Sequence, residues 1–353
     1  MVKYLKLLLL PFSLIYGAVT GLRNYLYNQG ILNVTSFDIP VIAVGNLTVG
    51  GTGKTPHVEY LLRLLQHYKL ATLSRGYKRE TKGFILANDQ STAAQIGDEP
   101  FQYHRDFPEV SVAVCEKRVE GIQKIKQQLP AINVVILDDA MQHRAIKPSL
   151  MVMLTDYNRP FFKDFILPAG LLREDRHGAA RADIVVVSKC PTNLPASTME
   201  RYESKIRKYT ATDTPIYFSS FKYGAPVSIG NSSQLYKNII LLTGIANPLP
   251  LQEHLKGAGY KIVKSFNFPD HHTYTIQDLL QVKSYLDGVN SSDISIVTTS
   301  KDAVKLTDTT LLESTKQLPL FYLPIEVSFL EKATLFDESV LNHVRQVGST
   351  TKK

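Results

Sequence analysis

Cysteine is scarce in this chain, and its scarcity excludes two kinds of protein. The 353 residues include only Cys115 and Cys190, each at the end of an apolar run. Two such residues form neither a disulfide framework nor a cysteine-based metal cluster. We interpret both as buried thiols in a reducing compartment. The composition, with 44% hydrophobic and 20% charged residues, also excludes a large disordered share.

An excess of acidic residues is also lacking. The 40 Lys and Arg residues outweigh the 32 Asp and Glu residues, and the net charge is +8. A basic balance favours anionic partners such as nucleic acid, phosphorylated substrates or an acidic membrane surface, and it does not choose among them. The length predicts two domains, because one domain averages roughly 150 residues.

Charged side chains are missing from residues 7–22, a run flanked by Lys3, Lys6 and Arg23. The run is shorter than the roughly 20 residues that a membrane-spanning helix needs. Pro11 would interrupt a helix unless it lies in the first turn. Three interpretations remain open at this point: a cleaved signal peptide, a helix buried in the protein's own core, and a helix lying in a membrane interface.

Alternating strand and helix signals follow this segment. An apolar run at residues 39–44 leads into a glycine-rich loop, and a helical stretch at residues 55–68 comes next. Continuous apolar runs, typical of strands that are covered on both faces, recur at residues 70–73, 111–114, 134–137, 150–154 and 184–187. This order predicts a doubly wound α/β sheet.

A second, smaller α/β unit is predicted nearer the C-terminus. Strand signals at residues 239–242 and 294–297 alternate with helical stretches at residues 251–256 and 276–286. Two segments rich in aromatic and β-branched residues bracket this unit, and they predict the strands of a connecting β-ribbon at residues 215–223 and 318–329.

The glycine-rich loop carries the strongest chemical signal, over Thr48, Val49, Gly50, Gly51, Thr52, Gly53, Lys54 and Thr55. The strict phosphate-loop pattern is G-x-x-x-x-G-K-[ST], and Thr48 stands where the leading glycine would be. Glycines let backbone N–H groups turn toward phosphate oxygens, and the next helix adds its positive N-terminus. Lys54 is expected to reach the β- and γ-phosphates, and the Thr55 hydroxyl to ligate Mg²⁺. The loop therefore predicts a P-loop NTPase fold.

Two adjacent carboxylates, Asp138 and Asp139, follow the apolar run at residues 134–137. A parallel sheet would place them beside the phosphate loop, where such an enzyme needs a carboxylate for its metal. Neighbouring carboxylates repel one another and are seldom structural. We expect both to serve Mg²⁺.

Three further polar clusters have a functional and a plain structural interpretation. Gly-Asp-Glu-Pro at residues 97–100, with Asp98, is either a functional acid or an exposed turn. Phe-Pro-Asp-His-His at residues 268–272, with His271, is either a helix-capping loop or part of a proton-transfer pair, since Asp and His are the usual members. Arg173 and Glu174 stand on a loop and face either an anionic acceptor or solvent.

Taken together, these clusters resemble those of the tetraacyldisaccharide 4'-kinases, which phosphorylate the lipid A disaccharide precursor on the cytoplasmic face of the bacterial inner membrane. The resemblance runs from the apolar N-terminus to about Lys305. Several motifs in one order carry it, at residues 44–56, 73–77, 97–100, 138–143, 167–170, 268–272 and 299–303.

The resemblance implies ATP as donor, Mg²⁺ as cofactor, and the 4'-hydroxyl of a tetraacyldisaccharide 1-phosphate as acceptor. It assigns Lys54 and Thr55 to the phosphates and the metal, and both adjacent carboxylates to the metal. It makes Asp98 the catalytic base and His271 its partner from the second domain, so the two domains must close on the nucleotide. Nucleic acid and an obligate protein partner are not expected.

The resemblance also favours the interfacial helix, because an acylated substrate stays in the bilayer, whereas export would separate the enzyme from its ATP. The expected location is the cytoplasmic face of the inner membrane. The expected division is an N-terminal membrane-associated helix over residues 1–25, a P-loop kinase domain over 26–214, a linker strand over 215–230, a second α/β domain over 231–317, and a return strand with a C-terminal helix over 318–353.

Two other classes of function compete with this interpretation. A nucleotide-dependent switch or metallochaperone would use hydrolysis for conformational change, but the guanine-reading Asn-Lys-x-Asp motif is replaced by Ser-Lys-Cys-Pro at residues 188–191. A soluble small-molecule kinase or ligase would leave residues 7–22 without a role. Membrane fractionation separates the second class from a lipid kinase.

Overall fold

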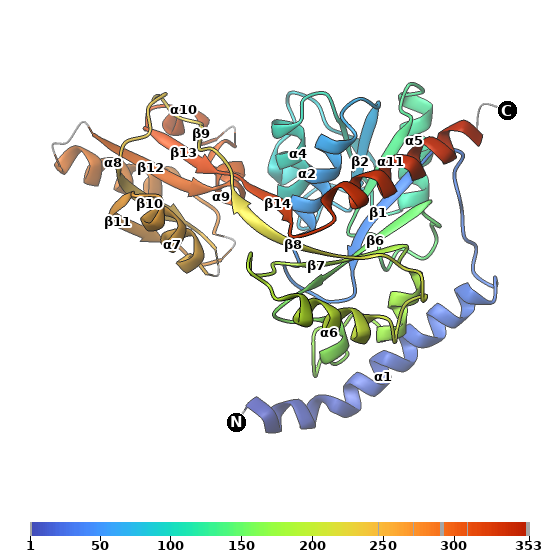
Figure 1. Cartoon of the computed structure of the whole chain (residues 1–353). Coiled ribbons are helices and arrows are strands. Elements are labelled where there is room, and N and C mark those ends of the chain that lie inside the picture. Colours follow the sequence, from blue (N-terminus) through green and yellow to red (C-terminus); the bar gives the residue numbers. More distant parts are fainter. Residues whose placement is uncertain (1, 246, 271, 290–292, 309, 351–353) are drawn as a thin grey trace.

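The computed structural model describes residues 2–245, 247–270, 272–289, 293–308 and 310–350, with side chains described from Leu8 to Ser349 within these ranges. Figure 1 shows two α/β units joined by a pair of strands, with the first helix set apart along one edge. The larger sheet runs in the order β14-β8-β7-β6-β1-β5-β2-β4-β3. Its strands are β1 (Val41–Asn46), β2 (Leu70–Ser74), β3 (Ile85–Leu86), β4 (Ser111–Val114), β5 (Val134–Asp138), β6 (Leu150–Asp156), β7 (Ile184–Ser188), β8 (Ile216–Tyr223) and β14 (Ile325–Phe329).

All pairings between β8 and β4 along this sheet are parallel, and only β3 and β14 run antiparallel to their neighbours. Strands β1, β2, β5 and β7 are buried along their whole length. This is what continuous Val, Ile and Leu runs predict, because helices must cover both faces of such strands. The predicted doubly wound α/β sheet is confirmed.

Helices cover both faces of this sheet and form two separate cores. One core contains side chains of α2 (Lys54–Leu64), α4 (Asp98–Asp106) and α11 (Ala333–Thr350). The other contains side chains of α5 (Arg118–Gln128) and α6 (Ala196–Ile206). In α2, Val58, Leu61 and Leu62 recur at helical spacing and are buried, so the expected apolar face points to the sheet. Three short helical turns complete the unit, namely α3 (Ala93–Ile96), η1 (Phe161–Lys163) and η2 (Arg176–Arg181).

The smaller unit is a second sheet in the order β11-β10-β12-β13-β9. Its strands are β9 (Val227–Ser228), β10 (Asn238–Thr243), β11 (Lys261–Asn267), β12 (Ile294–Thr299) and β13 (Leu320–Leu323). Its helices are α7 (Leu249–Gly257), α8 (Ile276–Gly288), α9 (Ser300–Leu306) and α10 (Leu312–Thr315). The strands from β11 to β13 are parallel, so this unit also presents the carboxyl ends of its strands along one edge.

The connecting ribbon differs from the expectation in one respect. Strands β8 and β14 pair antiparallel and join the two units, as the sequence predicts. Residues 318–329, however, are not one strand, because β13 pairs with β12 in the small sheet and β14 pairs with β8 in the large one. Pro324 separates them, and a proline lacks the N–H that a continuous ladder requires. The small sheet therefore extends into the segment that was expected to form only the return strand and helix.

Helix α1 (Val2–Asn28) is longer than the uncharged run, and Pro11 lies inside it instead of ending it. The helix touches the rest of the molecule along one side. The Ser13 hydroxyl donates to the Ile166 carbonyl at 3.0 Å and accepts from the Ala169 N–H at 3.0 Å. The opposite side is exposed, with Phe12 at 61%, so the interpretation as a helix buried in the protein's own core is wrong. No helix among the described residues has the length and apolarity to cross a membrane.

Candidate active site

The phosphate loop joins β1 to α2 and depends on two glycines. Gly50 has φ 109° and Gly53 has φ 83°, in a region that side-chain-bearing residues rarely adopt. A β-carbon on Gly53 would also lie 2.3 Å from Cζ of Phe221 in β8. Thr48 needs no glycine conformation, because it forms an isolated antiparallel bridge with Leu172 two residues after β1 and is not among the residues with positive φ. This bridge gives a physical reason for the missing leading glycine of the motif.

Two consecutive side chains at the end of β7 hold carbonyls of the loop. The Ser188 hydroxyl donates to the Thr52 carbonyl at 2.8 Å, and the Lys189 ammonium donates to the Gly51 carbonyl. Lys189 also pairs with Asp156 at 3.0 Å and has φ 58°. Within the loop, the Thr52 N–H also donates to the Gly50 carbonyl at 3.1 Å. Together these contacts hold the backbone of the loop in one conformation. The Ser-Lys-Cys-Pro pattern at residues 188–191 gives no local signal for this role.

The predicted carboxylates lie beside the loop, because β5 is the neighbour of β1 and Asp138 stands opposite Val44. Lys54 Nζ lies 3.6 Å from Oδ1 of Asp139 and 3.4 Å from Oδ1 of Asn46. The structure thus brings together the predicted Lys54, Thr55 and adjacent carboxylates, although their roles stay predictions.

Asp138 is buried, and its two oxygens have different surroundings. Oδ2 accepts a hydrogen bond from the Tyr103 hydroxyl at 3.0 Å. Oδ1 is buried and has no hydrogen-bond partner among the described residues. Burial raises the pKa of this carboxyl, while nearby Lys54 opposes that rise. A buried carboxylate oxygen without a partner is costly, and oxygen donors of this kind are what Mg²⁺ prefers, so the residues fit the expected metal.

Asp139 and Arg173 form a two-pronged ion pair. The guanidinium donates to the two carboxylate oxygens at 2.8 and 3.1 Å, and it also reaches the Asn46 carbonyl at 2.9 Å. Burial alone would raise the pKa of Asp139, but the Arg173 hydrogen bonds and Lys54 outweigh it and lower that pKa to about 2. Asp139 has φ 50°, so its backbone is held in a strained conformation at the site.

Glu174 connects the site to the first helix. Its carboxylate accepts from Asn24 of α1 at 2.7 Å, from Gln142 at 3.0 Å and from Arg181 at 2.7 Å. Gln142 also donates to the Asn46 carbonyl at 3.0 Å. Glu174 is only 3% exposed, so the interpretation of this side chain as a solvated surface charge is wrong. Sequence reasoning could not find this network, since its members come from four separate segments.

The predicted base, Asp98, begins α4 and is half-buried. Its predicted partner, His271, lies outside the described residues, so their pairing stays a prediction. The residues on either side of His271, Asp270 and His272, both contact α9. Lys305 donates to the His272 carbonyl at 2.8 Å, and Lys301 pairs with Asp270 at 3.4 Å. Both lysines belong to α9, which packs against α4.

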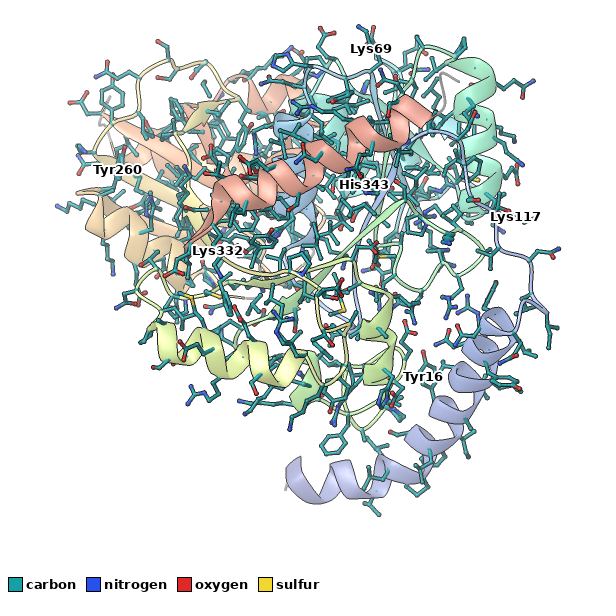
Figure 2. The ribbon with its side chains drawn as sticks, turned by 45° about the vertical axis from the view of Figure 1, so that its right-hand side comes forward. Tyr16, Lys69, Lys117, Tyr260, Lys332 and His343 are labelled. Atoms are coloured by element: carbon teal, nitrogen blue, oxygen red, sulfur yellow. The ribbon has the colours of Figure 1, made fainter. Side chains whose placement is uncertain are left out.

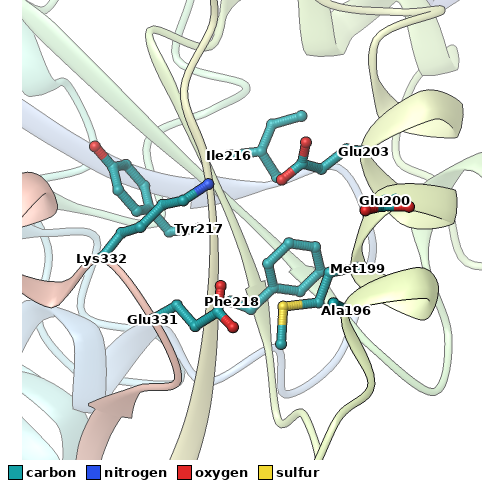
Figure 3. Close-up of a pocket in the computed structure, with 9 residues that line it drawn as sticks. All are labelled: Ala196, Met199, Glu200, Glu203, Ile216, Tyr217, Phe218, Glu331 and Lys332. Atoms are coloured by element: carbon teal, nitrogen blue, oxygen red, sulfur yellow. The ribbon is translucent and has the colours of Figure 1, made fainter.

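A cavity of about 180 Å³ lies elsewhere in the molecule, between α6, β8 and the turn into α11. Figure 3 shows its lining, which combines an apolar floor with three carboxylates and one ammonium group. The lining residues are Ala196, Met199, Glu200, Glu203, Ile216, Tyr217, Phe218, Glu331 and Lys332. None of them belongs to the phosphate loop or to the carboxylate pair, so this cavity is separate from the candidate site.

Comparison with known proteins identifies the family. The model of a family described as "Tetraacyldisaccharide-1-P 4'-kinase" matches residues 5–345. A tetraacyldisaccharide 4'-kinase of Flavobacterium johnsoniae is 43% identical over 97% of this chain and 98% of its own, and one of Cytophaga hutchinsonii is 44% identical over 92% of each. A crystal structure of LpxK from Aquifex aeolicus in complex with ATP covers 96% of this chain and 99% of its own, with 29% identity and a TM-score of 0.75. The resemblance inferred from the sequence motifs is confirmed, and the chain belongs to the tetraacyldisaccharide 4'-kinase family of enzymes.

Proposed function

We propose that this enzyme transfers the γ-phosphate of ATP to the 4'-hydroxyl of a tetraacyldisaccharide 1-phosphate at the cytoplasmic face of the inner membrane, with Mg²⁺ as cofactor. One observation carries the proposal beyond the family assignment. Asn46 ends β1 just before the phosphate loop, and its side chain lies 3.4 Å from Lys54 Nζ. Its carbonyl is linked through Gln142 and Glu174 to Asn24 of α1, whose outer side is apolar and exposed. A nucleotide site and a surface suited to lipid are thus parts of one hydrogen-bonded structure.

The nucleotide end of the site supplies positive charge around the phosphoryl group that is transferred. Backbone N–H groups of the loop and the N-terminus of α2 face the phosphates. Lys54, held near Asn46 and Asp139, neutralises charge on the β- and γ-phosphates. Thr55 and Asp138 would hold Mg²⁺, which would neutralise negative charge on the phosphates during transfer. Asp139, fixed by Arg173, adds a second carboxylate at the same position.

The part of the site proposed for the acceptor contains a carboxylate and several arginine side chains. Asp98 at the start of α4 would accept the proton of the attacking hydroxyl, with His271 as its partner. Burial, followed by the nearby Arg118, Arg75 and Arg23, lowers the pKa of His143 to about 4. Of these three arginines, Arg118 is buried, whereas Arg23 and Arg75 are exposed. The positive charge of the two exposed groups suits an acceptor that carries a phosphate.

The membrane side of the protein is an apolar surface that we call the α1 surface. It consists of exposed side chains of α1 and of Phe165, which is 53% exposed on the loop that Ser13 anchors. The contributing α1 side chains, each at least 60% exposed, are Leu8, Phe12, Leu14, Ile15, Val19 and Leu22. Contiguous apolar exposure of this kind marks a partner surface, and a helix with one apolar side suits the plane of a bilayer interface.

The test is transfer of labelled phosphate from [γ-³²P]ATP to a lipid A disaccharide 1-phosphate in mixed micelles, with Mg²⁺ either present or chelated. We expect Mg²⁺-dependent labelling of the lipid, and almost none with Lys54→Ala, because the transferred phosphoryl group loses its cationic partner. Lys124→Ala on α5, whose lysine forms an exposed pair with Glu120, is the matched control and should label normally. Unchanged labelling by Lys54→Ala would contradict the assignment of the loop.

A further inference from the structure

Tyr103 is a buried residue of α4 that the proposed chemistry does not use. It is 0% exposed, and its ring packs in the core beneath the larger sheet with α2 and α11. Buried tyrosines ordinarily find a hydrogen-bond partner for the hydroxyl, and the identity of that partner shows what the residue organises. Because the core packs closely around the ring, the position of the hydroxyl is fixed.

The hydroxyl of Tyr103 contacts one of the residues expected to hold Mg²⁺. It donates to Oδ2 of Asp138 at 3.0 Å. An ionised carboxylate is only an acceptor, so the single phenolic proton points to Asp138.

This hydrogen bond determines which oxygen of Asp138 remains available. Oδ2 accepts from Tyr103, while Oδ1 is buried and has no partner among the described residues. The Tyr103 hydroxyl thus orients the carboxylate so that one oxygen stays available to a hard cation.

We propose that Tyr103 is a positioning residue that sets the affinity of the enzyme for Mg²⁺ by orienting Asp138. The inference rests on the proposed function, because it takes Asp138 as a metal-binding residue. Groups that hydrogen-bond to metal ligands commonly contribute 10–100-fold in metal affinity. Tyr103 differs from an ordinary core residue in that loss of its hydroxyl alone should have this effect.

The test compares Tyr103→Phe with Tyr60→Phe. Tyr60 also donates to a partly buried carboxylate, Asp337 at 2.8 Å, but that contact joins α2 to α11 away from the site. For each protein, ADP affinity is measured by calorimetry over a series of Mg²⁺ concentrations and in EDTA. Binding of Mn²⁺ to the ADP complex is measured by electron paramagnetic resonance.

We expect Tyr103→Phe to bind the metal roughly 10–100-fold more weakly than the parent protein. It should bind ADP normally in EDTA and should fold like the parent protein, with an unchanged melting temperature. Tyr60→Phe should bind metal like the parent protein. In the background of Asp138→Asn, Tyr103→Phe should have little further effect, because the two residues act as one unit.

Metal affinity of Tyr103→Phe within twofold of the parent protein would overturn the inference. Equal weakening of ADP binding in EDTA, together with a lowered melting temperature, would assign Tyr103 a purely structural role and overturn it too. A full additional loss in the Asp138→Asn background would show that Tyr103 does not act through Asp138. A parent protein whose ADP binding ignores Mg²⁺ and Mn²⁺ would instead contradict the proposed function, which separates the two failures.

Discussion

Replacing Lys189 by methionine removes the ammonium group that holds the Gly51 carbonyl while keeping most of the aliphatic stem. A hydrogen bond from a charged donor contributes about 1.5–3 kcal/mol. The Lys189 side chain is 36% exposed, so solvent screening reduces this to about 1–2 kcal/mol. Without this contact the loop is less ordered before the nucleotide binds. Part of the free energy of binding is then used to order the loop, so the phosphates bind more weakly.

This free energy corresponds to a Kd for ATP and ADP that is about 5–30-fold higher. The assay is calorimetric titration of ATP and ADP, with adenosine affinity measured by displacement. Adenosine lacks the phosphates that the loop binds, so its affinity should not change. Ser188→Ala, which removes the neutral bond to the Thr52 carbonyl, should have a smaller effect in the same direction.

Lys124→Met is the matched control, because Lys124 pairs with Glu120 on the exposed side of α5. An ATP affinity of Lys189→Met within twofold of the parent protein would refute the reasoning. An equal loss of adenosine affinity would also refute it, because the damage would then extend beyond the phosphates.

Three further predictions concern the base, the stability and the first helix. Asp98→Asn and His271→Ala should each lower kcat about 10²–10⁴-fold, and the double variant should be little worse than either, whereas a multiplicative loss in steady-state assays would argue against a pair. Burial raises the pKa of Glu59 to about 7. The folded state therefore holds a proton that the unfolded state releases, and this contribution is present below about pH 4.5 and is lost as the pH rises through 7. Denaturation titrations should show Glu59→Gln gaining roughly 2–3 kcal/mol on the parent protein between pH 4.5 and 7.5, and parallel curves would contradict this. The lowered pKa of buried His57 acts in the opposite direction in both proteins and cancels in the comparison. Deleting residues 1–22 should weaken binding to anionic vesicles in flotation assays and leave ATP affinity intact, because Asn24 and its bond to Glu174 remain; loss of ATP binding would assign the helix a structural role.

The sequence was sufficient where one local pattern determines one local structure. The glycine loop with Lys54 and Thr55 was expected between a buried strand and a helix, and the carboxylates after the apolar run were expected at the end of a neighbouring strand; the structure has both there. Both follow from parallel-sheet geometry, which aligns strand ends along one edge. The family resemblance then supplied the kinase assignment, which the comparisons confirm.

The remaining features depend on tertiary packing, which a local pattern does not contain. Tyr103 matters because its hydroxyl reaches Asp138 at the end of β5, which lies 35 positions further along the chain. Arg173 was recognised as a candidate, but its partner Asp139 could not be inferred from the loop. The break at Pro324 had a signal in the sequence, since proline interrupts a ladder, but the aromatic and β-branched residues around it favoured one strand.

The most direct test of the central claim is the position of the transferred phosphate. The enzyme would be incubated with [γ-¹⁸O]ATP, Mg²⁺ and tetraacyldisaccharide 1-phosphate in mixed micelles, and the lipid product analysed by mass spectrometry and ³¹P nuclear magnetic resonance. The account predicts one added phosphate that carries the label, located on the 4'-oxygen, in a reaction that Lys54→Ala nearly abolishes. Mg²⁺-dependent ATP hydrolysis that leaves the lipid unlabelled, or a label at another position, would contradict it.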